Sequence, residues 1–290
     1  MKYQDSAVSE IIGTVILFAI VVTLVTAYMS WYVPLQEERS QGEYYSETLS
    51  AITQFVSKTY QNSTFVQEFP SGIYSGIGST ADTAVSYSNS LTSSLNVTMQ
   101  IELNASGKLK YVNETEAYTT AGILKSYPYT DFLKVETFNV YGNFISIDKT
   151  YYGPLNFNLS SNELRFNGVS LSSKGSVVSS PSSISVSGVP VESKIFQAVK
   201  GQILNLSGTK GIVEKITILS LNYTLNGSFS LSLFRYLSFA LNGTIEANED
   251  SFRYNNMTIK YAQNFLNVSS ISSFTVNDFY INYRDFYIAF

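Results

Sequence analysis

The chain has 290 residues without one Cys or His, which excludes disulfides, thiolate nucleophiles, Cys/His zinc sites and Ser-His-Asp triads. Its 18 Lys and Arg against 22 Asp and Glu give a net charge of -4. Nucleic acid is therefore not an expected partner, because proteins that bind phosphate backbones carry surplus positive charge. Charged residues make up only 14% of the chain, and 43 Ser, 23 Thr and 22 Asn take their place, as is typical of extracellular β domains.

An uncharged apolar run covers residues 11–33. As a helix rising 1.5 Å per residue it would measure about 34 Å, slightly more than the roughly 30 Å hydrocarbon core of a bilayer. Trp31 and Tyr32 stand at its outer end, where amphipathic rings favour the headgroup region, and Pro34 is expected to kink or end the helix. The sequence thus predicts a transmembrane helix over residues 8–34.

Three other interpretations of this run differ in where the helix lies and whether the mature protein keeps it. A buried core helix is disfavoured, because such a helix seldom stays apolar on all sides for six turns. A cleaved secretory signal would use the small residues 25–27 as its cleavage site, but the run is long for a signal sequence. A permanent signal-anchor would keep the short N-terminal tail inside the cell and the rest of the chain outside.

Small residues on this helix predict close packing against another helix. Ala19, Thr23 and Ala27 recur at every fourth position and therefore stack on one face, and Gly13 lies nearer the start of the same helix. The alternative is that small residues are simply common in membrane helices.

The stretch SAVSEIIGTVIL at residues 6–17 resembles the N-terminal segment of archaeal type IV pilins and pilin-like proteins. The resemblance implies that a prepilin peptidase removes a leader, residues 1–7, by a cut among Ser6, Ala7 and Val8. It also implies that the hydrophobic helix is retained, first as a membrane anchor and then as the core of a filament made of copies of the chain or related pilins.

Two departures from the family pattern keep an uncleaved anchor open. Ser6 stands where the family often places Lys or Arg, and Glu10 stands where many relatives have Pro. The resemblance to the family covers about thirty of the 290 residues, whether or not the leader is cleaved.

Residues 35–60 predict a helical extension or stalk. Apolar residues recur there with helical spacing among glutamates, namely Leu35, Leu49, Ile52, Phe55 and Val56. Beyond the stalk the period changes to two, as in Leu95, Val97, Met99, Ile101 and Leu103, which indicates half-buried strands.

The same alternation returns in residues 216–225, 229–233 and 274–290. Turn-forming dipeptides interrupt these runs: Ser106-Gly107, Gly142-Asn143, Asn167-Gly168, Asn226-Gly227 and Asn242-Gly243. The sequence therefore predicts an N-terminal pilin-like helix followed by a mainly antiparallel, sandwich-like β ectodomain.

A Ser-rich segment divides the β part in two. Ten of the eighteen residues from 170 to 187 are Ser. The segment 169–190 is either a linker between two sandwiches, β region 1 (61–168) and β region 2 (191–290), or a hairpin within one larger sandwich.

Asn-x-Ser/Thr sequons are about twice as frequent as composition predicts, eleven against about five. Each is an acceptor site for an N-glycan, and glycans would make up for the scarcity of surface charge. All lie beyond the apolar run: Asn62, Asn96, Asn104, Asn113, Asn158, Asn205, Asn222, Asn226, Asn242, Asn256 and Asn267.

No spacing of carboxylates, phosphate-binding loop or metal motif predicts catalysis, a cofactor or a metal, so an enzyme is not expected. Together with the apolar helix, the resemblance to archaeal type IV pilins implies a pilin-like structural protein of the cell membrane, with its C-terminal domain outside, or of an extracellular filament, for adhesion or surface contact. The alternative is a permanently anchored, glycosylated β ectodomain that binds the surface layer or a glycan of the envelope. N-terminal processing would distinguish the two.

Overall fold

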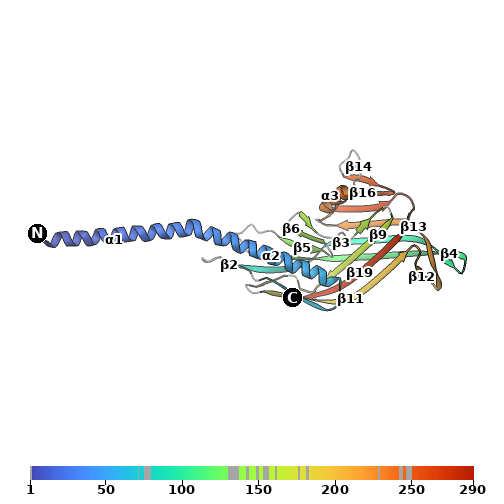
Figure 1. Ribbon diagram of the computed structural model, residues 1–290, viewed down its shortest axis with the longest axis horizontal. Helices are drawn as coiled ribbons and strands as arrows, with labels where there is room; N and C mark the ends of the chain where they lie inside the picture. The colour runs from blue at the N-terminus through green and yellow to red at the C-terminus, as the bar shows by residue number, and fades with distance from the viewer. Residues whose placement is uncertain are drawn as a thin grey trace.

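A long helical rod leads into a β-sheet body, with the N-terminus at the free end of the rod and the C-terminus in the body (Figure 1). The computed structural model describes residues 2–70, 72–74, 80–129, 137–141, 144–147, 150–152, 157–160, 162–175, 177–180, 183–227, 229–241, 244–245 and 250–290. The predicted fold class, an N-terminal helix followed by a mainly antiparallel β domain, is confirmed.

The rod is helical throughout its length. It comprises α1 (Lys2–Ala27), a π-helical turn η1 (Tyr28–Tyr32) and α2 (Val33–Thr59). The helix therefore does not end at Pro34, which stands in the first turn of α2. The turn before it is widened, since the Val33 N–H donates to the Tyr28 carbonyl, five residues back. This irregularity accommodates a residue that has no N–H and whose ring crowds the preceding turn.

The body contains a small and a large sheet. The order in the small sheet is β1 (Phe65–Phe69), β11 (Ile184–Val199), β19 (Asp278–Ala289), β9 (Glu163–Ser172) and β8 (Phe157–Leu159), with a parallel β9–β19 pair among antiparallel ones.

The large sheet is antiparallel and is built around the long hairpin of β3 and β4. Its order is β14 (Thr244–Ile245), β15 (Ser251–Tyr254), β16 (Met257–Ala262), β17 (Phe265–Ser270), β13 (Thr209–Asn226), β3 (Thr80–Ala105), β4 (Lys108–Tyr129), β5 (Phe138–Tyr141), β6 (Phe144–Ile147) and β7 (Thr150–Tyr152). Four short strands pair with β3 or β13: β2 (Ile73–Tyr74), β10 (Val177–Ser180), β12 (Ile203–Leu206) and β18 (Phe274–Val276).

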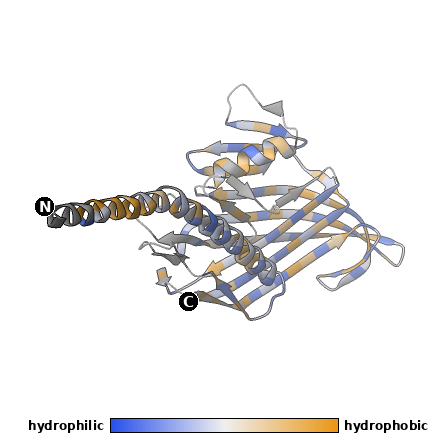
Figure 2. Cartoon of the chain, turned by 60° about the vertical axis from the view of Figure 1, so that its left-hand side comes forward, coloured by the Kyte–Doolittle hydropathy of each residue, from blue (hydrophilic) through white to orange (hydrophobic). Residues whose placement is uncertain are grey.

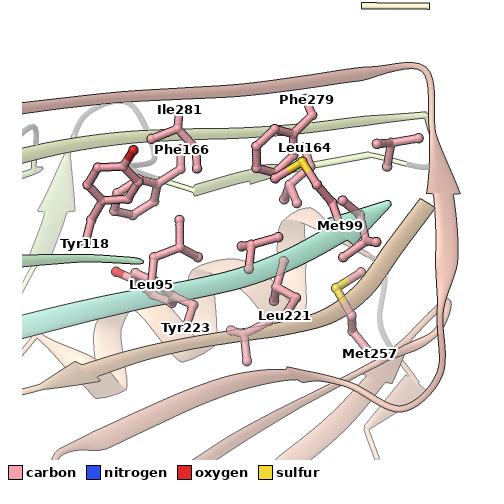
Figure 3. Close-up of a cluster of buried hydrophobic side chains, with 14 of the residues drawn as sticks. Leu95, Met99, Tyr118, Leu164, Phe166, Leu221, Tyr223, Met257, Phe279 and Ile281 are labelled. Atoms are coloured by element: carbon pink, nitrogen blue, oxygen red, sulfur yellow. The ribbon is translucent and has the colours of Figure 1, made fainter. Parts of the chain in front are cut away.

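The two sheets pack face to face around an apolar core (Figure 3). Leu95 and Met99 of β3 and Leu221 of β13 meet Phe166 of β9 and Phe279 of β19. This contact explains the alternation along β3, because one side of the strand is buried in the sandwich and the other faces solvent.

A third helix, α3 (Ser230–Ala240), covers part of the large sheet. Its Phe234 ring lies 5.4 Å from the ring of Phe252 on β15 and 5.8 Å from that of Tyr261 on β16. The helix belongs to the same apolar core as the two sheets.

Strands from both parts of the predicted β domain alternate in the two sheets. In the large sheet β3 pairs with β13, and in the small sheet β9 pairs with β19. The Ser-rich segment 169–190 contributes the end of β9, strand β10 on β3, and the start of β11 between β1 and β19. Regions 61–168 and 191–290 therefore share one core.

Three local predictions were wrong, for reasons visible in the structure. Residues 229–233 begin α3, because Phe229, Leu233 and Leu237 at helical spacing are buried, and two-residue alternation over so short a run fits a helix face as well. Asn167-Gly168 lies within β9, and Asn226-Gly227 leads from β13 into α3.

The predicted hairpin at Ser106-Gly107 is confirmed. Ala105 pairs with Lys108, and both turn residues have positive φ, +53° and +82°, as a two-residue type I′ turn requires. Gly142-Asn143 and Asn242-Gly243 lie outside the described residues.

Candidate membrane anchor and surface sites

Hydrophobic residues follow one another along α1, which projects away from the body (Figure 2). The large apolar side chains from Ile11 to Val25 are exposed on every side of the helix. Within the described residues, one helix near the N-terminus is long and apolar enough to cross a membrane. Its hydroxyl groups bond within the helix: Thr14 donates to the Glu10 carbonyl at 2.9 Å, and Thr23 to the Ala19 carbonyl at 2.8 Å. Every polar group inside the hydrocarbon core of a bilayer needs a hydrogen-bond partner within the protein, and these hydroxyl groups already have one.

Aromatic residues gather where the apolar run ends. Tyr28 and Tyr32 stack with ring centroids 4.9 Å apart, and the Trp31 side chain is exposed. The three rings lie in η1, immediately before the charged residues of α2. The position matches the headgroup level of a bilayer if α1 occupies its core.

The structure places the predicted packing and processing residues on α1. Ala19 and Thr23 lie one turn apart on one face, with Ala27 a turn further, and a methyl group added at Gly13 would meet nothing within 4 Å. Close packing against another helix stays a prediction. Ser6, Ala7 and Val8 continue α1 without a break, and their cleavage also stays a prediction.

The C-terminal half of α2 docks on the body through a second apolar cluster. Ile52 and Phe55 are fully buried, and the Phe55 ring makes an edge contact with Phe65 of β1 at 5.4 Å. Both sheets contribute to this cluster, including Leu171 of β9 and Val140 of β5. The stalk predicted over residues 35–60 is thus held against the body along its second half.

A buried arginine closes the end of α2. Arg284 of β19 donates from Nη1 to the Thr59 carbonyl at 2.9 Å, and its guanidinium lies 5.7 Å from the centre of the Tyr60 ring. A cation at this end of a helix satisfies an unpaired carbonyl and complements the helix dipole. Burial lowers the pKa of Arg284 from its ordinary value. The rod and the small sheet are therefore tied together by a polar contact as well as by apolar packing.

A polar cluster also connects the two sheets. Glu116 of β4 is buried, accepts a hydrogen bond from the Tyr118 hydroxyl at 2.5 Å and lies 3.4 Å from Lys194 Nζ of β11. The Tyr118 and Tyr283 rings lie 5.2 Å apart. Burial, and then the Glu116 carboxylate, raise the pKa of Tyr118.

Nearby, burial raises the pKa of Asp285 on β19, partly opposed by a hydrogen bond from Ser170. Within the described residues no group of three or more acidic side chains could hold a metal ion. The polar cluster around Glu116 was not predicted from the sequence, because Glu116 and Lys194 look like ordinary surface residues of two distant strands.

The predicted glycan acceptors differ in their exposure. Seven of the asparagines are exposed: Asn62, Asn96, Asn113, Asn205, Asn222, Asn226 and Asn256. Asn104 and Asn267 are half-buried, and the Asn104 amide donates to Glu214 at 3.2 Å. The side chain of Asn158 and the whole of Asn242 lie outside the described part of the chain.

Two sequon asparagines are direct cross-strand partners. Asn96 of β3 pairs with Asn222 of β13 on the outer face of the large sheet. The Cβ atoms of such pairs are about 4.5–5.5 Å apart. Two bulky substituents would collide there.

A polar cavity of about 590 Å³ opens beside the turn between β15 and β16. Its lining combines hydroxyl and amide groups with the Phe274 ring, and includes Asn256. The sequence held no signal for it, because the lining comes from three separate segments.

No family model matches the chain, and neither a curated protein nor a solved structure matches it.

Proposed function

We propose that this chain is a pilin-like structural protein of the cell surface, anchored in the membrane by α1 and able to assemble through that helix into an extracellular filament for adhesion or surface contact. The observation that carries the proposal is the exposure of α1 on all sides, with its threonine hydroxyls bonded internally. Water would disfavour such a surface, so lipid or neighbouring helices should cover it.

The fixed junction between rod and body supports this role. Because Phe55 is buried and Arg284 holds the end of α2, the body keeps a set orientation relative to the anchor. A subunit that stacks with copies of itself needs such a defined angle. The prepilin peptidase would act at residues 6–8, as the resemblance to archaeal type IV pilins implies.

N-terminal sequencing of the protein from its native cells tests the processing step. A start at Ala7 or Val8 is expected, because the resemblance places the cut there. A start at Tyr28 would show a secreted product without the helix and would overturn the proposal.

A charge in the middle of α1 tests the anchor. Val21→Lys should reduce membrane retention and surface filaments strongly, because a lysine at the bilayer centre costs about 2.5–3.5 kcal/mol on insertion scales. Val189→Lys on β11 is a matched control, since the two valines are 47% and 45% exposed. Retention and filaments that respond equally to both variants would contradict the proposal.

Glycosylation is proposed for several of the exposed sequons. An intact mass above that of the bare polypeptide is expected for the native protein. A mass equal to the bare polypeptide would refute this part.

The alternative is a permanently anchored, glycosylated β domain that binds the surface layer or a glycan of the envelope. Two residues favour it, because Ser6 and Glu10 depart from the pattern of the processed family. Retention of Met1 together with membrane association and an absence of filaments in electron micrographs would support this alternative.

A further inference from the structure

Two neighbouring hairpins form the end of the body that lies farthest from the free end of the rod (Figure 1). One joins β3 to β4 through Ser106-Gly107, and the other joins β12 to β13 through Ser207-Gly208. Both turns have positive φ at both residues, so they are tight and of the same kind.

Four large apolar side chains are exposed beside these turns. Leu109 is 54% exposed, Tyr111 60%, Ile203 67% and Ile212 44%. Cross-strand pairing places three of them in one row. Asn104 of β3 pairs with Leu109 of β4 on one side and with Ile212 of β13 on the other, and Ile212 pairs in turn with Ile203 of β12.

Paired residues lie on the same face of a sheet, and Tyr111 follows Leu109 by two residues, so all four share the outer face of the large sheet. We call Leu109, Tyr111, Ile203 and Ile212 the tip patch. A cluster of exposed apolar residues of this kind marks an interaction site more often than a plain surface does.

The tip is positively charged in an acidic protein. Residues 104–111 and 200–215 hold five lysines against one glutamate, whereas the whole chain carries a net charge of -4. The lysines are exposed: Lys108, Lys110, Lys200, Lys210 and Lys215. Lys210 pairs with Asn205, and Lys215 pairs with Glu102 at 3.9 Å, so these two lysines lie on the patch face. Lys108 and Lys110 alternate with Leu109 and Tyr111 and therefore project from the opposite side of the same hairpin, so the tip carries lysines on both sides.

We propose that the tip patch and its lysines dock onto an anionic lipid bilayer. Apolar side chains with an aromatic ring, bordered by lysines whose stems can extend toward headgroups, are the combination that binds the interface of an anionic membrane. An acidic polymer without apolar groups would pair with the lysines but would leave the four apolar side chains exposed. This proposal rests on the proposed function. With α1 inserted in one membrane, the tip points away from that membrane and can contact a second one.

Two sequons lie among the patch residues. Asn104 pairs with both Leu109 and Ile212. Asn205 lies on the same face as Ile203, two residues along β12, and pairs with Lys210. A glycan on either asparagine would cover the patch. The proposal therefore expects Asn104 and Asn205 to be unmodified in the native protein, although both are among the eleven sequons. Full occupancy of either one in native glycopeptides would overturn it.

Capture of a second vesicle tests the proposal with the full chain. The protein, produced without N-glycans, is reconstituted through α1 into phosphatidylcholine vesicles. Fluorescent vesicles containing phosphatidylglycerol are then added, and co-flotation is measured. They should be captured at least tenfold more than fluorescent vesicles of phosphatidylcholine alone, and added salt should reduce the capture.

Two variant pairs separate the contributions of the patch and the lysines. Ile203→Ser with Ile212→Ser, and Lys108→Gln with Lys210→Gln, one lysine from each side of the tip, should each lower capture about tenfold or more. These side chains are exposed, so the melting temperature should not change. Phe239→Ser on α3, 83% exposed, and Lys174→Gln with Lys260→Gln are the controls and should leave capture intact.

Equal capture of anionic and neutral vesicles would overturn the proposal. So would capture that soluble polyglutamate abolishes and the Ile203/Ile212 pair leaves unchanged, because the site would then bind acidic polymers. Flotation of the chain with its own vesicles reports on the proposed function separately. If the chain does not float, co-sedimentation of the free chain with the anionic vesicles gives the same readout for the tip.

Discussion

Removal of the Phe55 side chain should undock the stalk from the body. The ring is fully buried between α2 and β1, with an edge contact to Phe65 at 5.4 Å and a tilted contact to Phe69 at 6.4 Å. Phe→Ala changes at buried sites cost about 3–5 kcal/mol, from lost apolar transfer and from the cavity left behind. With two aromatic partners lost, we expect Phe55→Ala to cost at least the middle of that range, about 4 kcal/mol.

Hydrogen exchange by mass spectrometry on the detergent-solubilised chain measures this effect locally. Amides in the second half of α2 should lose protection, while those of β3 and β13 in the sandwich core should keep theirs. Leu35→Ala on the same helix is the control, because Leu35 is 51% exposed and its truncation should change little. Equal loss of protection in the two variants, or none in α2 for Phe55→Ala, would refute the docking described for this helix.

Three further predictions concern the body. Gly122→Ala should lower the free energy of unfolding by more than about 2 kcal/mol in a urea titration, because φ is +91° and the new Cβ would lie 2.3 Å from a β9 carbonyl oxygen. Gly107→Ala, at φ +82° but with open space around it, is the control and should lose only about 1 kcal/mol. Equal losses in the two variants would contradict the contact. Burial raises the folded-state pKa of Asp285, so the protein loses stability as pH rises through that pKa and the carboxylate becomes charged. Asp285→Asn should therefore raise the melting temperature at pH 7, and this gain should disappear below the ordinary pKa of 3.8. A variant that is less stable at pH 7 would argue against the burial effect. If the sequons are used, the occupancies of Asn96 and Asn222 measured by glycopeptide mass spectrometry should together not exceed one glycan per chain. A larger sum would exclude the close pairing.

The elements that could be predicted are those whose pattern is long. The two-residue alternation of β3 runs for nine residues, and the helical spacing of α2 extends over several turns, so each matches a single kind of structure. The run at 229–233 was too short to separate the two periods, and the burial of Phe229, Leu233 and Leu237 on one side of α3 decided it.

The contacts of the candidate sites could not be predicted because their partners are far apart in the chain. Glu116 meets Lys194 across the sandwich, and Arg284 reaches Thr59 from the last strand. Each of these residues resembles an ordinary surface residue in the sequence. Strand order brings them together, and no local preference specifies that order.

By itself, the sequence determined the helix that can span a membrane and the β character of the remainder, since both depend on the polarity of consecutive residues and on backbone preference. Tertiary structure alone decided which apolar side chains remain uncovered. Val97 and Ile212 are similar aliphatic residues of neighbouring strands, yet the small sheet covers Val97 and nothing in the described chain covers Ile212. The physical reason is that burial depends on whether a second layer lies above a residue, and that layer is supplied by distant parts of the chain.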